Sequence, residues 1–304
     1  MKRFITFLGI LLGICIAYAQ DYADQSVLSA GKWTKMGIVE SGVYRLELSD
    51  LTSAGFDPNT LDPRNIHIYG NGGGMLPQPN STERPDDLLE IPITVLGEAD
   101  GRFDPGDAVL FYAEGADGYV WNTESQLLGN EQNLYADTNF YFITVNDLVG
   151  KRVQSVASAS NSTFDVASFR GTAFHEVDLE NPIESGRLWL GETFSGALSQ
   201  RTFSLYIPDV SSNGNIRVSM RVAAASSIPS QFTVTAGNLA PFQVTIGKVN
   251  IGAETSANYR FSTNTFSVPK SALSGDSLRI TLDYASSDFQ AIGWLDFIDI
   301  DFDQ

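Results

Sequence analysis

The segment IDIDFD at residues 298–303 indicates the fold class, because every second residue in it is an aspartate. Successive side chains of a β-strand point to opposite faces of the sheet. The segment therefore predicts a strand that buries Ile298, Ile300 and Phe302 in a core and turns its aspartates toward water. Short runs rich in Val, Ile, Phe, Tyr and Thr recur upstream between breaks of Gly, Asn, Asp, Ser and Pro. We therefore expect an all-β protein.

The expected strands fall into two groups. The first group covers residues 43–48, 65–69, 89–95, 108–113 and 140–145, and the second covers 174–178, 200–207, 216–223, 231–236, 242–249, 258–267 and 278–284. The second group, closed by the strand at 298–303, predicts a β-sandwich of the jelly-roll or Greek-key type. One short helix is expected at residues 51–54, with Ser49 as its N-cap, Gly55 in a left-handed conformation after it, and Pro58 preventing its continuation.

The length of 304 residues, with 43% apolar residues, is sufficient for two domains. Residues 155–163 read SVASASNST, which is the small, polar composition of a linker. We therefore predict two consecutive β domains, an N-terminal one at 20–155 that holds the short helix and a β-sandwich at 169–304, joined by a linker at 156–168.

The first 19 residues have the pattern of a secretory signal peptide. Lys2 and Arg3 precede an apolar stretch at residues 4–16, and an AYA cleavage site follows at 17–19. The stretch is too short for a membrane span, and no other segment is long and apolar enough for one. A lipoprotein signal would need a small residue before Cys15, where Ile14 stands. We therefore expect an exported chain without a membrane span.

Cysteine and charge exclude several functions. Cys15 is the one cysteine of the sequence, so cleavage of the leader would leave no thiol nucleophile. An exported chain without disulfides is typical of a bacterial envelope or secreted protein. The sequence has 19 Lys and Arg residues and 36 Asp and Glu residues, which gives a net charge of -17. The absence of a Lys/Arg cluster excludes nucleic-acid binding, and the acidic surface is compatible with a basic partner or a bound cation.

Two segments are candidates for binding contacts. Gly72, Gly73 and Gly74 follow Asn71, but the prolines behind them exclude the helix that a phosphate-binding loop requires. A tight turn explains these glycines, and the exposed loop could also contact a partner. Trp121 lies in the segment DGYVWN, which we interpret as a loop that could present the ring to a partner or a sugar. Together with Trp33, Trp189 and Trp294 it could form a sugar-stacking surface, but we favour packing for the tryptophans, above all for Trp33 and Trp294, which lie in apolar, strand-like segments.

The segment EADGRFDPGD at residues 98–107 is the one candidate for a metal site. It holds four carboxylates, Glu98, Asp100, Asp104 and Asp107, and calcium favours such hard oxygen ligands. The spacing is not that of an EF-hand, and a turn before a strand explains the same residues. Calcium is thus the only cofactor to consider.

The two histidines do not form a recognisable catalytic or zinc motif. His67 lies within the alternating segment IHIY, where a strand side chain is the simpler interpretation, and His175 is more than a hundred positions away. A zinc site would want a close pair of histidines, and no Gly-x-Ser-x-Gly motif marks a serine nucleophile. We therefore assign no catalytic residue.

Seven stretches together resemble one family. They are SVLSAGKW at 26–33, GVYRL at 42–46, NIHIYGNGGGMLP at 65–77, RPDDLLE at 84–90, DGRFDPGDAVLFY at 100–112, NFYFI at 139–143 and GWLDFI at 293–298. These stretches look like the N-terminal region of the type IX secretion system sortases of Bacteroidetes, which belong to the gingipain-type (C25) cysteine peptidases. The segments at 71–77 and 100–107 are the most specific.

The resemblance implies a surface-exposed, outer-membrane-associated enzyme that removes the C-terminal sorting signal of cargo and attaches the cargo to the cell surface. In the family, a caspase-like domain with a Cys/His dyad follows the region seen here. No position of this chain matches that dyad, so we expect a truncated or separated module that is inactive alone. It would dock to or support a C25-type catalytic domain and outer-membrane secretion components. A secreted carbohydrate-binding β-sandwich and a purely structural surface protein are the alternatives.

Overall fold

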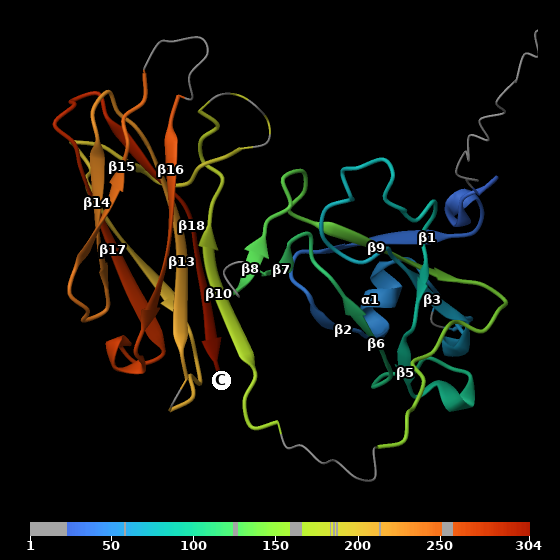
Figure 1. The fold of residues 1–304 in the computed structure, drawn as a ribbon. Helices are drawn as coiled ribbons and strands as arrows, with labels where there is room; N and C mark the ends of the chain where they lie inside the picture. The colour runs from blue at the N-terminus through green and yellow to red at the C-terminus, as the bar shows by residue number, and fades with distance from the viewer. Residues whose placement is uncertain are drawn as a thin grey trace, which may run out of the picture.

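A computed structural model describes residues 23–57, 59–123, 127–158, 166–182, 184, 186, 188–212, 214–250 and 258–304. The expected leader, and residues 159–165 of the expected linker, lie outside the described residues. The described chain is almost entirely β and forms two bodies, each with its own hydrophobic core (Figure 1). The expected all-β class is thus confirmed. No helix in the described part is long and apolar enough to cross a bilayer.

The first body contains two antiparallel sheets. One has the order β1-β9-β3-β4, and the other has the order β2-β6-β5. Their strands are β1 (Trp33–Ile38), β2 (Gly42–Leu46), β3 (Ile66–Tyr69), β4 (Glu90–Ile91), β5 (Thr94–Leu96), β6 (Ala108–Ala113) and β9 (Asn139–Val145). Side chains from both sheets and from α1 (Leu48–Ser53) form one buried cluster, which includes Ile68, Phe111 and Tyr141.

The short helix exists, but it begins earlier than the sequence indicated. Ser49 lies within α1 and is not its cap; the N-cap is Glu47, whose backbone N–H donates to the Asp50 carboxylate at 2.8 Å. An acidic side chain in the first turn can satisfy a free N–H as well as a serine at the cap can. Gly55 follows the helix at φ 86°, as expected. Further single turns of 3₁₀ helix occur at Val27–Ser29, Pro63–Asn65, Glu98–Asp100 and Lys270–Ala272.

Two strand predictions in this body were wrong. The single strand expected at residues 89–95 is divided into β4 and β5, because Pro92 lacks the N–H that a continuous ladder needs. The segment with Trp121 was expected to be a loop but is strand β7 (Gly118–Asn122). It pairs with β8 (Leu127–Glu131), and this hairpin lies between the two bodies, beside β10 (Figure 1).

The second body is a jelly roll. Its sheets have the orders β10-β18-β13-β16 and β12-β17-β14-β15, with β11 added beside β18. This is the interleaved order of two Greek keys, and it confirms the predicted topology. Its strands are β10 (Arg170–Glu176), β11 (Thr193–Phe194), β12 (Gln200–Tyr206), β13 (Ile216–Ala225), β14 (Ser230–Ala236), β15 (Phe242–Ile246), β16 (Arg260–Val268), β17 (Ser277–Ala285) and β18 (Ile292–Asp303).

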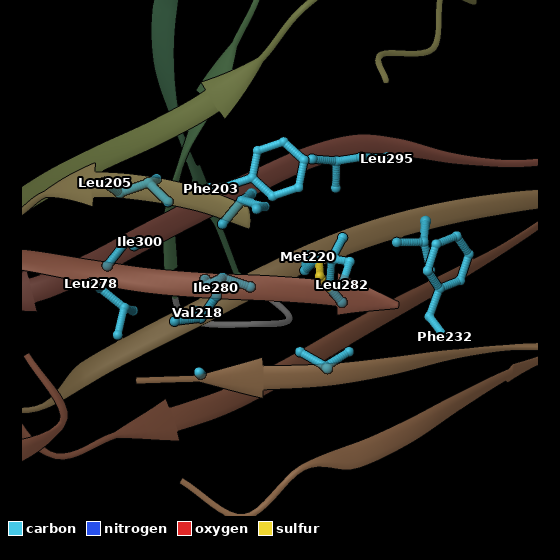
Figure 2. Close-up of a cluster of buried hydrophobic side chains, with 14 of the residues drawn as sticks. Phe203, Leu205, Val218, Met220, Phe232, Leu278, Ile280, Leu282, Leu295 and Ile300 are labelled. Carbon is cyan, nitrogen blue, oxygen red and sulfur yellow. The ribbon is translucent and has the colours of Figure 1, made fainter. Parts of the chain in front are cut away.

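The core of the jelly roll lies between its two sheets, as Figure 2 shows. Phe232 of β14 is fully buried, and its ring packs against those of Phe194 and Tyr284. Ile298, Ile300 and Phe302 of β18 are buried in the same cluster, as the alternation predicted. The opposite face of β18, which carries Asp299 and Asp301, contacts β8 of the hairpin.

Candidate functional site

The hairpin β7–β8 of the first body covers the outer face of β18 in the second. The backbone N–H of Leu128 donates to Asp301 Oδ2 at 3.2 Å, and the N–H of Asn130 donates to Asp299 Oδ1 at 3.4 Å. The side chain of Asp301 is only 2% exposed. The expectation that the aspartates of β18 face water is therefore wrong for Asp301, because the first body supplies donors that replace water.

Two arginines also hold Asp301. Its Oδ1 atom accepts from Arg170 of β10 and, at 3.4 Å, from Arg217 of β13. The guanidinium of Arg170 lies 5.7 Å from the ring centre of Trp121 in β7. Arg170 therefore bridges the two bodies, since it joins the ion pair on one side to a cation–π contact on the other.

Partly buried carboxylates gather at the same junction. Burial raises the pKa of Glu176 to about 7, and the neighbouring negative charge of Asp296 adds to the rise. Burial likewise raises the pKa of Asp299 to about 6, although the hydrogen bond from Asn130 and the charge of Arg221 oppose it. The junction thus holds carboxyl groups that change protonation near neutral pH.

A cleft of about 1100 Å³ opens beside this junction, between the edge strands β10 and β12. Glu40 and Tyr119 from the first body line it together with residues of the jelly roll. Phe174 of β10 and Tyr206 of β12 are among the lining side chains, and they are 42% and 66% exposed. Two smaller hollows, of about 440 and 510 Å³, continue the cleft along the junction, because neighbouring hollows share Glu40 or Asp117. We call the three together the junction groove.

The strands that border the junction groove have unpaired edges. Backbone groups of an antiparallel strand point alternately toward and away from the neighbouring strand. The pairs Ser199–Tyr284 and Ile207–Asp276 are hydrogen-bonded, so Phe203 and every second residue around it face β17. The backbone groups of Thr202, Ser204 and Tyr206 therefore point into the groove, and no strand in the described part pairs with that edge.

His175 and Glu192 form the one histidine–carboxylate pair in the groove. Nε2 of His175 lies 2.8 Å from Glu192 Oε1, and the imidazole packs 4.9 Å from the Phe203 ring centre. The second oxygen of Glu192, Oε2, is buried without a hydrogen-bond partner among the described residues. The pair supplies an acceptor that could receive a donor from a ligand.

Gly72, Gly73 and Gly74 lie in the first body, where local geometry favours glycine. The N–H of Gly73 donates to Glu114 Oε2 at 2.6 Å, and a Cβ on Gly73 would lie 2.3 Å from the Gly115 carbonyl oxygen. Gly72 and Gly74 have φ of 79°, which favours glycine. Packing thus accounts for Gly73, and the backbone conformation accounts for Gly72 and Gly74. None of the three glycines lines the junction groove. A partner contact at Gly72, Gly73 or Gly74 stays a prediction.

The acidic residues of the calcium prediction have other partners. Glu98 Oε2 accepts from Arg152 Nε at 2.9 Å, and the carboxylates of Asp100 and Asp107 accept backbone N–H groups within the loop. Asp104 contributes its own N–H to Asp107. Among the described residues no group of three or more His, Cys, Asp or Glu side chains is arranged to hold a metal ion. Calcium binding at this loop stays a prediction.

His67, Trp294 and Trp33 have structural roles in their own bodies. His67 is buried, with Nδ1 2.7 Å from Glu90 Oε1 and Nε2 3.0 Å from Asn146 Oδ1. Trp294 is buried and donates to Glu180 Oε2 at 2.8 Å, and Trp33 donates to the Ala30 carbonyl at 2.7 Å. Trp121 is 45% exposed and lies on β7 at the junction.

The residues that line the junction groove were not found from the sequence. Tyr119, Phe174, Tyr206 and Glu192 lie in four different segments, so no local motif joins them. One signal was available: in β12 the exposed residues Thr202, Ser204 and Tyr206 alternate with buried ones. That pattern indicates a strand with a solvent-facing side but does not indicate which edge is unpaired.

The comparisons with known proteins include a solved structure that is similar to this chain over most of its length. No family model matches the sequence, and no curated protein is significantly similar to it. The structure is similar to that of dimeric latent PorU from Porphyromonas gingivalis, with a TM-score of 0.75 and 24% identity over 93% of this chain. This chain spans 25% of that protein's length. A CBM36 carbohydrate-binding module solved with calcium and xylotriose covers 44% of this chain at 14% identity, but its TM-score of 0.27 supports no argument.

Proposed function

We propose that this chain is the non-catalytic N-terminal portion of a PorU-like sortase of the type IX secretion system, acting as a docking and folding-support module for a C25-type catalytic domain. The observation that carries the proposal is the similarity of both bodies together to PorU, over 93% of the chain at a TM-score of 0.75. The sequence motifs that resemble these sortases point the same way. In that family, the complete enzyme cleaves the sorting signal of cargo and attaches the cargo to the cell surface.

The chemistry of the chain supports a role in binding rather than in bond cleavage. A C25-type peptidase needs a thiolate nucleophile activated by a neighbouring base. Cys15 is the only cysteine among the 304 residues, and it lies in the segment that we interpret as the leader. The pair of His175 and Glu192 therefore has no thiol to activate. The mature chain would act through its shape and surface contacts.

The junction between the two bodies is suited to such a role. Asp301 and Asp299 accept hydrogen bonds from the backbone N–H groups of Leu128 and Asn130, and these bonds join the hairpin to the jelly roll. Two bodies joined in this way present one continuous surface to a partner. Because their relative orientation is already fixed, less conformational entropy is lost when the partner binds. We propose that the module is exported and works at the outer membrane, in contact with the catalytic domain and secretion components.

Two assays on the purified mature chain test this function. The chain alone is incubated with a peptide that carries a C-terminal sorting signal, and we expect no cleavage. The C25-type catalytic domain from the same organism is then refolded with and without the chain, and we expect a higher yield of active enzyme with it. Cleavage by the chain alone, or an unchanged refolding yield, contradicts the proposal. An equal excess of an unrelated β-sandwich protein is the control.

A secreted carbohydrate-binding module is the second candidate. The half-exposed indole of Trp121 favours it, since aromatic faces stack on sugar rings. Binding on a glycan array that is lost in Trp121→Ala, or a calcium-dependent rise in melting temperature, would support this alternative over docking.

A further inference from the structure

The free edge of β12 is available for pairing. Exposed edge strands present a row of N–H and C=O groups that readily pair with another chain, and natural proteins cover or charge such edges. The exposed side chains of β12 beside this edge are Thr202, Ser204 and Tyr206, none of them charged. β10, on the other side of the groove, contacts both β8 and β12. No strand in the described part pairs with the edge of β12 that faces away from β17, so its backbone groups are available to an incoming strand.

The groove is strongly negative. Its lining includes the carboxylates of Glu40, Asp117, Asp137, Asp178 and Glu192. The one arginine in the lining is Arg201, whose Nε already donates to the Thr193 carbonyl at 3.0 Å. Burial raises the pKa of Asp178, and repulsion by Asp296 and Asp117 raises it further. These carboxylates repel each other, and a cationic ligand would relieve that repulsion.

We propose that the junction groove binds an extended, cationic segment of a partner polypeptide, which adds as a strand to the free edge of β12. Main-chain hydrogen bonds to Thr202, Ser204 and Tyr206 hold the segment, and its lysine or arginine side chains face the carboxylates of the groove. Tyr119 and Phe174 supply the apolar contacts. The proposal deepens the proposed function and rests on it for the identity of the partner.

A peptide fits these features better than a glycan does. A neutral or acidic sugar can donate hydroxyl hydrogen bonds to the carboxylates but has no positive charge to balance them, and it has no regular row of donors and acceptors to match a strand edge. A strand from a partner satisfies both features together. The exposed aromatic side chains of Tyr119 and Tyr206 alone do not distinguish the two ligands.

The direct test is calorimetric titration of the mature chain with a synthetic peptide of alternating lysine and valine, as long as the seven residues of β12. Two matched peptides serve as controls: one has glutamate in place of lysine, and the other carries N-methyl groups on alternate backbone nitrogens. We expect binding of the lysine peptide that weakens as salt rises. The glutamate peptide should not bind, and N-methylation should weaken binding about tenfold by removing main-chain donors.

Substitutions in the chain, in place of changes to the peptide, test the same edge. Ser204→Pro removes a backbone N–H that does not pair with β17, and edge strands tolerate proline at such positions. We expect it to weaken binding of the lysine peptide about tenfold, whereas Ser204→Ala leaves binding unchanged. Should Ser204→Pro not fold, Glu192→Gln with Asp178→Asn provides a second test, and we expect about tenfold weaker binding and a smaller salt dependence.

The outcomes separate this proposal from the proposed function. Equal affinity for the lysine and N-methylated peptides, no binding at all, or binding of glycans in the groove instead overturns the groove proposal. If the catalytic domain depends on the module but the peptide does not bind, only the groove proposal fails. If the peptide binds as expected but the refolding yield of the catalytic domain is unchanged, only the proposed function fails.

Discussion

Asp301 and Leu128 are 173 positions apart in the chain, yet the carboxylate of Asp301 accepts the backbone N–H of Leu128 at 3.2 Å. This bond joins the last strand of the jelly roll to the hairpin of the first body. It explains why an aspartate on the outer face of a sheet can be buried, since a protein donor has replaced the water.

Removal of the Asp301 carboxylate should destabilise the protein. Asp301→Ala leaves the Leu128 N–H without its acceptor and removes one ion-pair partner from each of Arg170 and Arg217. We expect a loss of about 2–3 kcal/mol in the free energy of unfolding, below the range for fully buried pairs because the arginines are partly exposed. Urea denaturation measures it. Asp276→Ala, at an exposed position, is the matched control, and equal effects for the two variants would refute the assigned role.

Stability should fall as pH rises through neutrality. Glu176 has its pKa raised from 4.5 to about 7 in the folded protein, so folding favours its protonated form. Its contribution to stability is fully present below pH 4.5 and is lost as pH rises through 7. Melting temperatures measured from pH 5 to pH 8 should therefore decrease, and Glu176→Gln should flatten this decrease. Glu131→Gln, at an exposed position of β8, should leave it unchanged.

The loss of stability expected at acidic pH has a different origin. The pKa of Asp87 is lowered, first by the hydrogen bond from the Val27 N–H, and the pKa of Asp288 is lowered, first by the Ser227 hydroxyl. Such groups contribute stability above their ordinary pKa near 3.8, and this contribution is lost as pH falls through the lowered values. A melting temperature that rises steadily from pH 5 to pH 8 would contradict the assignment to Glu176.

The glycine loop should tolerate no side chain at its centre. Gly73→Ala would place a Cβ 2.3 Å from the Gly115 carbonyl, so the backbone must shift. We expect a loss of about 1–3 kcal/mol in thermal or denaturant unfolding. Gly42→Ala is the control, since a Cβ there meets no neighbouring atom within 4 Å. A loss of partner binding by Gly73→Ala at unchanged stability would instead favour a direct contact role for this loop.

Truncation of Trp121 should loosen the junction slightly. Trp121→Ala removes the ring that faces the Arg170 guanidinium, and we expect a cost of about 0.5–1 kcal/mol at this exposed site. Val120→Ala, on the same strand and similarly exposed, is the matched control. Hydrogen exchange of the β8 amides reports the effect locally. Faster exchange in both variants alike would mean that the cation–π contact contributes nothing specific.

The alternation of apolar and polar residues made most of the fold predictable. The segment at 298–303 is buried at Ile298, Ile300 and Phe302, and the strand expected at 108–113 was confirmed as β6. Jelly-roll topology followed from the number and length of the later strands. These features depend on local periodicity, which a single sequence contains.

The junction could not be predicted, because it depends on pairs far apart in the chain. Nothing near Asp301 indicates that Leu128 will supply a donor, and nothing near Phe174 indicates that Tyr119 lies across the groove. The hairpin with Trp121 was missed because its strands are short and its glycines suggested a loop. The glycine and acidic segments are local motifs, but their contacts are packing contacts within one body.

The most direct test of the account is the affinity of the purified mature chain for a separately produced C25-type catalytic domain from the same organism, measured by isothermal titration calorimetry. We expect a one-to-one complex, with no cleavage of a sorting-signal peptide by the module alone. Absence of heat and of any complex over the whole concentration range, with both proteins folded, would contradict the docking role.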